Sequence, residues 1–190
     1  MAVPSPTKAE FRAWLRKLRD VYVGSWSLPD RCANAARFAE RALPLLAGAK
    51  TVAVYLPIGT EVDTLPLIGI LDAQGVALAL PFYSGLKAPP LFLAWKPGDT
   101  LLSGPMGLRQ PDPATAAAVD PDAFIVPLLG YTEALDRLGY GAGYYDRAFA
   151  AWPDAKRIGI AWDCQKSRWL PIDPWDVRLH AIVTDEGVVS

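Results

Sequence analysis

The chain has 190 residues, of which 52% are hydrophobic and 21% charged, and its formal net charge is -1. This length fits one compact domain, so we expect residues 1–190 to form a single domain. The composition is globular, and the bulk charge gives no reason to expect a nucleic-acid partner. No stretch approaches the ~18 apolar residues of a membrane span, and the N-terminus lacks the apolar segment of a signal peptide. We therefore expect a cytoplasmic protein without a membrane partner.

The first predicted helix begins after Thr7. Thr7 and Glu10 have the spacing of a capping box, and the apolar residues that follow recur at intervals of three and four. The opposite side of this helix carries a stripe of cations, namely Lys8, Arg12, Arg16 and Arg19. Such a stripe is most often a solvated basic face. The alternative is that its first turn holds a polyanionic ligand.

The rest of the chain alternates predicted helices and strands. A second helix begins near Pro29 and runs until Pro44, and a third is predicted over residues 65–71. Short apolar, β-branched segments predict strands over residues 51–56, 76–81, 91–95, 123–129, 157–161 and 180–184, with an irregular loop over 104–111. This alternation predicts an α/β fold, a three-layer sandwich with a largely parallel sheet flanked by helices.

Two acids follow the first predicted strand, at Glu61 and Asp63. Ligands in open α/β sheets bind at the carboxyl ends of the strands, so either carboxylate is a candidate for contacting one. Each can equally be an exposed loop acid or a helix cap.

Residues 137–147 read RLGYGAGYYDR and combine glycines, tyrosines and arginines between a predicted strand and a predicted helix. A helix N-terminus offers unpaired N–H groups, and glycine lets the backbone approach an anion closely. The glycine spacing matches neither a P-loop nor the dinucleotide-binding fingerprint. Arg137 and Arg147 can each bind a phosphate or carboxylate, and the tyrosines offer flat faces to an aromatic ligand. We therefore favour a ligand-binding loop over a purely structural turn.

Several common chemistries are disfavoured. His180 is the only histidine and lies within a predicted strand, which argues against a nucleophile–histidine triad. Cys32 and Cys164 are far apart and have no metal-ligand spacing, so neither a zinc site nor a disulfide framework is expected. What remains is an anion-binding loop, several arginine and lysine side chains, and aspartates able to hold magnesium. Enzymes that transfer phosphoryl groups use these features.

Several segments resemble the 5-formyltetrahydrofolate cyclo-ligase family. The most specific match is to the family's Pro-led strand and R-L-G-x-G-x-G-x-Y-D-R loop, which correspond here to residues 126–131 and 137–147. Supporting matches are Lys8-Ala9-Glu10-Phe11-Arg12, Tyr55-Leu56-Pro57, Glu61-Val62-Asp63-Thr64 and a C-terminal pattern that includes Gln165, Asp176 and Thr184. Thr132, Leu135 and Trp175 stand where the family usually has an aspartate, a glycine and a histidine.

The resemblance implies an ATP- and Mg²⁺-dependent cyclisation of 5-formyltetrahydrofolate to 5,10-methenyltetrahydrofolate through a phosphorylated formyl group. It implies catalytic roles for Arg137 and Tyr144, folate contacts from Glu61 and Tyr144, and magnesium binding by Asp146 and Asp176. The implied ATP contacts are Lys8, Arg12, Arg137, Gly139, Tyr140, Gly141, Ala142, Gly143 and Tyr145.

The expected partners are these small molecules, and the expected state is a monomer or weak homodimer. Two alternatives stay open: a folate- or nucleotide-binding relative without catalytic activity, and a sugar-phosphate enzyme on a similar scaffold, because fold does not determine function.

Overall fold

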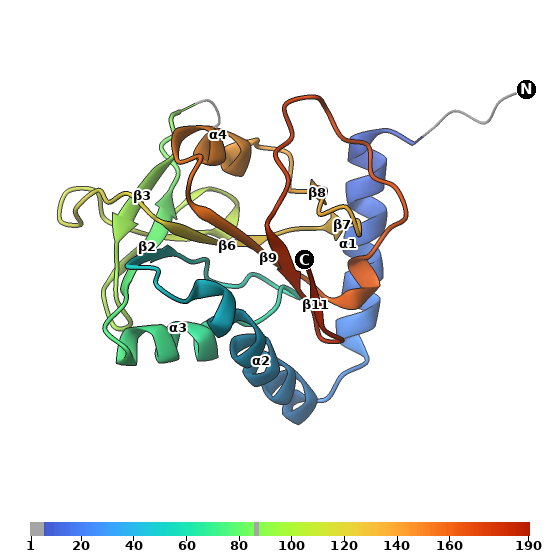
Figure 1. The fold of residues 1–190 in the computed structure, drawn as a ribbon, viewed down its shortest axis with the longest axis horizontal. Helices are drawn as coiled ribbons and strands as arrows, with labels where there is room; N and C mark the ends of the chain where they lie inside the picture. The colour runs from blue at the N-terminus through green and yellow to red at the C-terminus, as the bar shows by residue number, and fades with distance from the viewer. Residues whose placement is uncertain (1–5, 86–87) are drawn as a thin grey trace, which may run out of the picture.

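The structure is a computed structural model, and it describes residues 6–85 and 88–190 (Figure 1). Its centre is one sheet made of β1 (Thr51–Ala53), β2 (Ala77–Phe82), β3 (Leu91–Ala94), β6 (Ala123–Pro127), β9 (Lys156–Ile160), β10 (Ala181–Val183) and β11 (Val188–Val189). The seven strands lie in the order β11-β10-β9-β6-β1-β2-β3. The pairings from β10 through β2 are parallel, and only the edge strands β11 and β3 pair antiparallel with their neighbours. The predicted, largely parallel sheet is thus confirmed.

Helices cover both faces of this sheet. They are α1 (Lys8–Gly24), α2 (Leu28–Ala42), α3 (Leu65–Ala73) and α4 (Tyr144–Ala151), with short 3₁₀ turns η1 (Leu43–Leu46), η2 (Pro105–Gly107) and η3 (Asp163–Gln165). Figure 1 shows α2 and α3 on one side of the sheet and α4 on the other, which is the predicted three-layer arrangement. In the described part of the chain, no helix is both long enough and apolar enough to cross a membrane.

The first helix begins where the sequence predicts. The Glu10 amide donates to the Thr7 hydroxyl at 3.2 Å, and the Thr7 amide donates to the Glu10 carboxylate at 2.8 Å. This reciprocal pair is a capping box, which satisfies two N–H groups that the helix itself cannot. The capping box fixes the start of α1 at Lys8.

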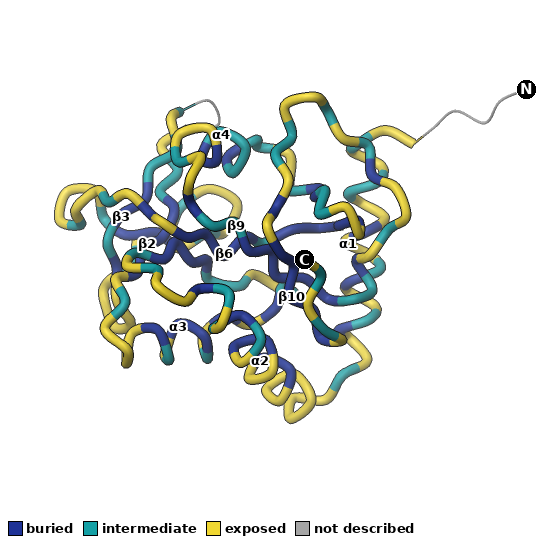
Figure 2. Tube along the Cα trace, viewed as in Figure 1, coloured by how far each residue is buried: buried dark blue, intermediate teal, exposed yellow. Residues whose placement is uncertain are grey.

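Alternate residues along the strands face opposite sides of the sheet. Val52 and Ile125 belong to the core shared with α2 and α3, whereas Ala53 and Phe124 belong to the core under α4. Because neighbouring strand residues point to opposite faces, apolar strand residues at successive positions require helices on both sides. Figure 2 shows the strands buried and the outer faces of α2 and α3 exposed.

The strand prediction over residues 123–129 is wrong at its end. Strand β6 stops at Pro127, and a small hairpin of β7 (Gly130–Tyr131) and β8 (Arg137–Leu138) separates it from the glycine-rich loop. Leu15 of α1 packs with Leu129 and Leu138 in a cluster of its own, so this hairpin holds α1 in place. The turn contains no glycine, proline or asparagine that would predict it from the sequence. Leu135 adopts the positive φ of 66° that glycine usually supplies.

The irregular loop predicted over residues 104–111 is also wrong in part. β4 (Leu101–Ser103) and β5 (Arg109–Pro111) pair antiparallel on either side of η2. The chain reverses through positive φ values at Met106 and Gly107, 57° and 79°. Met106 is not a residue type that favours this conformation, which is why the turn chemistry did not predict a hairpin.

Candidate active site

A cavity of about 750 Å³ lies at the carboxyl ends of β1, β2 and β6. This is where α/β sheets bind ligands, because the loops that leave parallel strands gather at one edge. Its lining comes mainly from the basic side of α1, the loop after β1, the glycine-rich loop with the start of α4, and residues 173–176. Pro81, Tyr83, Met106, Leu108 and Pro127 complete it. The residues to which the resemblance assigns a site role all line this cavity, so the structure brings that set together, whereas Asp63 does not line it.

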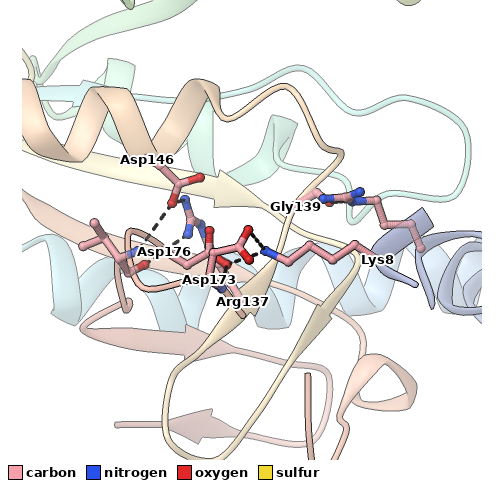
Figure 3. Close-up of polar contacts among 8 residues, drawn as sticks. Lys8, Arg137, Gly139, Asp146, Asp173 and Asp176 are labelled. Atoms are coloured by element: carbon pink, nitrogen blue, oxygen red, sulfur yellow. Dashed lines mark hydrogen bonds and ion pairs between the residues drawn. The ribbon is translucent and has the colours of Figure 1, made fainter. Parts of the chain in front are cut away.

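At one end of the cavity Lys8 is paired with two carboxylates (Figure 3). Its ammonium lies 2.6 Å from Asp173 Oδ2 and 2.8 Å from Asp176 Oδ2. Burial lowers the pKa of Lys8, but the two carboxylates outweigh it and raise the pKa above its usual value. Burial likewise raises the pKa of Asp176, and hydrogen bonds from Lys8 and the Asp173 amide bring it below the usual value. The pair is therefore charged at neutral pH.

Arg137 lies beneath this cluster and is almost fully buried. It donates to Asp146 Oδ1 at 2.7 Å and to the Val177 carbonyl at 3.1 Å, and its guanidinium lies 4.8 Å from the Phe149 ring centre. Burial lowers the pKa of Arg137, while the charges of Asp146 and Asp176 raise it. A guanidinium remains protonated under such conditions. Arg137 thus joins β8, α4 and the loop before β10, and its predicted contact with ATP stays a prediction.

The glycine-rich loop passes close to Arg12. The Arg12 Nε donates to the Gly139 carbonyl at 2.9 Å, and a Cβ added to Gly141 would lie 3.2 Å from Arg12 Cζ. Gly141 has a φ of 101° and Gly143 one of 61°, both in the left-handed region that favours glycine. Gly143 is the N-cap of α4 and supplies no side-chain cap. The first-turn N–H groups of α4 are therefore suited to binding an anion.

The three tyrosines of the loop occupy different environments. The Tyr144 hydroxyl donates to the Leu91 carbonyl at 2.6 Å, and the Leu91 amide donates to it at 3.1 Å, so this side chain fastens α4 to edge strand β3. Its ring stacks 4.3 Å from Tyr83. Tyr145 is partly buried and lines the cavity. Tyr140 reaches across the cavity to Glu61.

Glu61 is a partly buried carboxylate that also lines the cavity. The Tyr140 hydroxyl donates to one of its oxygens and the Ile58 amide donates to the other at 2.9 Å. Burial raises the pKa of Glu61, and these two hydrogen bonds together with the charges of Arg19 and Arg16 partly offset the rise. Asp63 behaves differently: its carboxylate accepts from the Leu65 amide at 2.9 Å, which satisfies the first N–H group of α3 from the position before the N-cap Thr64.

The sequence prediction missed Arg19 as a site residue. It lies in the basic stripe of α1, but only 5% of it is exposed, and it contacts both Tyr140 and Thr60. The spacing of Arg19 from Arg16 places it in the basic stripe. Its burial depends on the packing of α1 against the loops that carry Thr60 and Tyr140, which the local sequence does not show. Tyr55 and Tyr83 also line the cavity. Tyr55 was named from the sequence only within a matching segment, with no site role, and Tyr83 was not named.

Magnesium binding was predicted for Asp146 and Asp176. Within residues 6–85 and 88–190, no group of three histidine, cysteine, aspartate or glutamate side chains is arranged to hold a metal. The two aspartates each pair with a cation, Arg137 and Lys8. Mg²⁺ is commonly held by one or two carboxylates, with water and substrate phosphates completing its shell. The residues present therefore fit an ion held jointly with a nucleotide.

Two of the three departures from the family pattern lie in the turn of the β7–β8 hairpin. The Thr132 hydroxyl donates to Asp136 at 3.1 Å, and Leu135 occupies the left-handed position where a glycine is usual. Neither borders the cavity. Trp175 does line it and is 69% exposed. His180 lies just before β10 and pairs with Arg157, a structural role.

Comparison with known proteins shows the family of this chain. Residues 4–185 match the 5-formyltetrahydrofolate cyclo-ligase family. The 5-formyltetrahydrofolate cyclo-ligase of Escherichia coli (strain K12) is 36% identical over 152 residues, which cover 76% of this chain and 83% of that protein. The protein of the same name from Mycolicibacterium smegmatis is 31% identical over 150 residues, 74% of this chain and 77% of that protein.

Solved structures are similar over nearly the whole chain. The 5,10-methenyltetrahydrofolate synthetase of Aquifex aeolicus aligns with a TM-score of 0.69 at 28% identity, covering 95% of this chain and 91% of that one. The 5,10-methenyltetrahydrofolate synthetase of Mycoplasma pneumoniae has a TM-score of 0.73 at 24% identity, with coverage of 95% and 99%, and supports the fold. On its sequence and its fold, this chain belongs to the 5-formyltetrahydrofolate cyclo-ligase family.

Proposed function

We propose that this protein converts 5-formyltetrahydrofolate to 5,10-methenyltetrahydrofolate with ATP as co-substrate and Mg²⁺ as cofactor. The observation that carries the proposal is one cavity that gathers the cations Lys8 and Arg12, the N–H groups at the start of α4 and the carboxylate of Glu61. The cations and N–H groups suit the phosphates of ATP, and the carboxylate suits the N–H groups of a pterin ring. We call the part lined by Lys8, Arg12 and the glycine-rich loop the cationic end, and the part lined by Glu61 the carboxylate end. Family membership supplies the reaction class.

The proposed reaction has two steps, phosphoryl transfer from ATP to the formyl oxygen and then ring closure. The formyl oxygen attacks the γ-phosphorus of ATP, and ADP leaves with the electrons of the broken P–O bond. The formyl carbon then carries phosphate, a far better leaving group than oxide. N10 attacks that carbon and loses its proton, and phosphate departs to leave the N5–CH–N10 bridge of the methenyl product. Catalysis of such a transfer depends mainly on positioning and charge stabilisation.

The cationic end is proposed to bind ATP. Lys8 has three donors, two of which its carboxylate partners use, so one remains for a phosphate oxygen. The first-turn amides of α4 and the loop Gly139, Tyr140, Gly141, Ala142 and Gly143 would surround the phosphates, with Arg12, Arg137 and Tyr145 beside them. Arg137 would act mainly by holding Asp146 and α4 in place.

The carboxylate end is proposed to bind the folate. The reduced pterin presents adjacent N–H donors, which one carboxylate can accept, and Glu61 is kept oriented by Tyr140 and Ile58. Tyr144 and Tyr83 would provide the aromatic wall against which the ring packs. Asp146 and Asp176 would hold Mg²⁺ together with the nucleotide, and the ion would supply charge neutralisation at the phosphates.

Thr132 and Leu135 lie in the hairpin turn, so they give no reason to prefer a relative that binds without turnover. Trp175 lines the cavity, and the following assay decides between the two alternatives. We further propose that residues 1–190 form one domain that acts on small molecules in the cytoplasm as a monomer or weak homodimer. The test is ADP release by the purified protein, measured with Mg²⁺ present and with or without 5-formyltetrahydrofolate. Folate-dependent ADP release is expected; binding of both ligands without ADP release would favour the non-catalytic alternative.

A further inference from the structure

Arg19 is a buried cation that serves two loops of the cavity. Its Nη1 donates to the Tyr140 hydroxyl at 2.8 Å, and its Nε donates to the Thr60 hydroxyl at 3.0 Å. Only 5% of the residue is exposed. Burying a guanidinium costs free energy unless its N–H groups donate hydrogen bonds. The contacts with Tyr140 and Thr60 therefore offset the cost of burying Arg19.

The Tyr140 hydroxyl lies between Arg19 and Glu61. It accepts from Arg19 and donates its single proton to Glu61 Oε1. With Arg19 occupying a lone pair, the hydroxyl proton is directed toward the carboxylate. The orientation of the Tyr140–Glu61 hydrogen bond thus depends on Arg19.

The second contact of Arg19 holds the loop that carries Glu61. The Thr60 hydroxyl donates to Asp20, the neighbour of Arg19 on α1, and the Thr60 carbonyl accepts from Trp162 Nε1 at 2.9 Å. Thr60 is therefore bound through both its side chain and its backbone. Glu61 follows it directly, so the position of its carboxylate is determined from α1.

We infer that Arg19 is a positioning residue, which orients the Tyr140 hydroxyl toward Glu61 and so links the glycine-rich loop to the carboxylate end of the cavity. The inference rests on the proposed function, in which the loop binds ATP and Glu61 binds the folate.

The charges around Glu61 make this inference testable by pH. The groups that face it are Arg16, Arg19 and Asp20 from α1, Tyr55 and Tyr83 after β1 and β2, Tyr140 from the loop and Tyr145 from α4. Burial raises the pKa of Tyr55, Tyr83 and Tyr145, so these tyrosines stay neutral in any practical assay. Arg19 and Tyr140 both lower the pKa of Glu61 against the effect of burial. Removing either is expected to raise that pKa further.

The experiment compares R19Q, R19K and Y140F with wild type in methenyl formation across pH. We expect R19Q to raise the KM for 5-formyltetrahydrofolate about tenfold or more, with a smaller effect on kcat, because a charged hydrogen-bond partner is lost. The acidic limb of kcat/KM should move to higher pH in both R19Q and Y140F. R19K keeps the positive charge, so its pH profile should resemble that of wild type. It lacks the several N–H donors of a guanidinium, so its KM for 5-formyltetrahydrofolate should stay raised. K17Q, on the exposed side of the same helix, is the matched control and should match wild type.

Three outcomes are informative. An unchanged folate KM and acidic limb in R19Q and Y140F would overturn the inference. If R19Q fails to fold by circular dichroism, R19K, which keeps the charge but not the several N–H donors, decides it by the KM for 5-formyltetrahydrofolate: a rise of about tenfold supports the inference and an unchanged KM overturns it. If wild type forms no methenyl product, the proposed function fails, and the pH dependence of 5-formyltetrahydrofolate binding by calorimetry in the same variants decides the role of Arg19: a shift supports it and no shift overturns it.

Discussion

The ammonium of Lys8 lies 2.8 Å from the carboxylate of Asp176, and so joins residues 168 positions apart. The contact ties the first turn of α1 to the loop before β10 and places a cation between two carboxylates at the mouth of the cavity (Figure 3). A phosphate that reaches Lys8 arrives beside acids able to share a metal ion with it. Lys8 is predicted to bind the nucleotide and Asp176 to bind magnesium, so their contact places the two predicted functions side by side.

Replacing Lys8 tests the nucleotide half of that connection. K8M keeps much of the side-chain length but removes the charge, and we expect the KM for ATP to rise about tenfold or more. Stability should change by only about 0–1 kcal/mol, because the ion pair is partly solvated. Steady-state kinetics with varied ATP checks this. K17M, which changes an exposed lysine of the same helix, should leave the KM for ATP unchanged; an equal effect in both variants would refute a specific role for Lys8.

The ion pair of Arg137 with Asp146 should contribute more to stability than an exposed one. A double-mutant cycle of R137A and D146A is expected to give a coupling energy of about 1–3 kcal/mol in denaturant unfolding, because the guanidinium is buried. The pair of Arg178 with Asp136 has the same 2.7 Å separation, but the Arg178 side chain is 63% exposed. Its cycle should give a coupling energy below about 1 kcal/mol. Equal coupling in the two cycles would contradict the role assigned to Arg137.

Gly141 is predicted to be intolerant of a side chain. Alanine there must adopt a φ of 101° and approach the Arg12 guanidinium at 3.2 Å, so G141A should cost about 1–2 kcal/mol of stability and weaken ATP binding. G139A is the comparison within the same loop, since its added Cβ meets no atom within 4 Å. Denaturant unfolding and ATP titration measure the two effects. A G139A variant as destabilised as G141A would show that the loop conformation differs from the one described.

Leu135 should be replaceable by glycine with relief of backbone strain. Its φ is 66°, a conformation that costs a non-glycine residue about 1 kcal/mol or more, and its side chain is only partly buried against the core under α4. L135G and L135A lose the same packing to within one methyl group. L135G is therefore expected to be more stable than L135A by about 1 kcal/mol in thermal or chemical unfolding. Equal stability of the two variants would contradict the left-handed conformation.

Features that depend on local pattern could be predicted from the sequence. The capping box of Thr7 and Glu10 and the apolar spacing behind it predict α1, and successive apolar residues in short strands predict a sheet covered on both faces. The glycine-rich loop and Glu61 could be selected because their residue types are unusual at strand ends. The resemblance then grouped them with Lys8 and Asp176, which no local pattern connects.

The remaining features depend on long-range packing. Whether Arg19 is solvated or buried is decided by how α1 meets residues 58–61, and neighbouring arginines of the same stripe differ in this respect. The roles of Tyr140 and Tyr144 separate only once β3 and Glu61 are in place. The two small hairpins were missed because Met106 and Leu135 take positive φ values that their residue types disfavour.

The central claim is that this cavity couples ATP cleavage to closure of the one-carbon bridge. The most direct measurement follows the near-ultraviolet absorbance of the methenyl product and the release of ADP in one reaction of purified protein, 5-formyltetrahydrofolate, ATP and Mg²⁺. We predict one ADP for each methenyl group formed, with neither product appearing when ATP or the folate is omitted. Methenyl formation at an undiminished rate without ATP, or its absence at high protein concentration with every component present, would contradict the account.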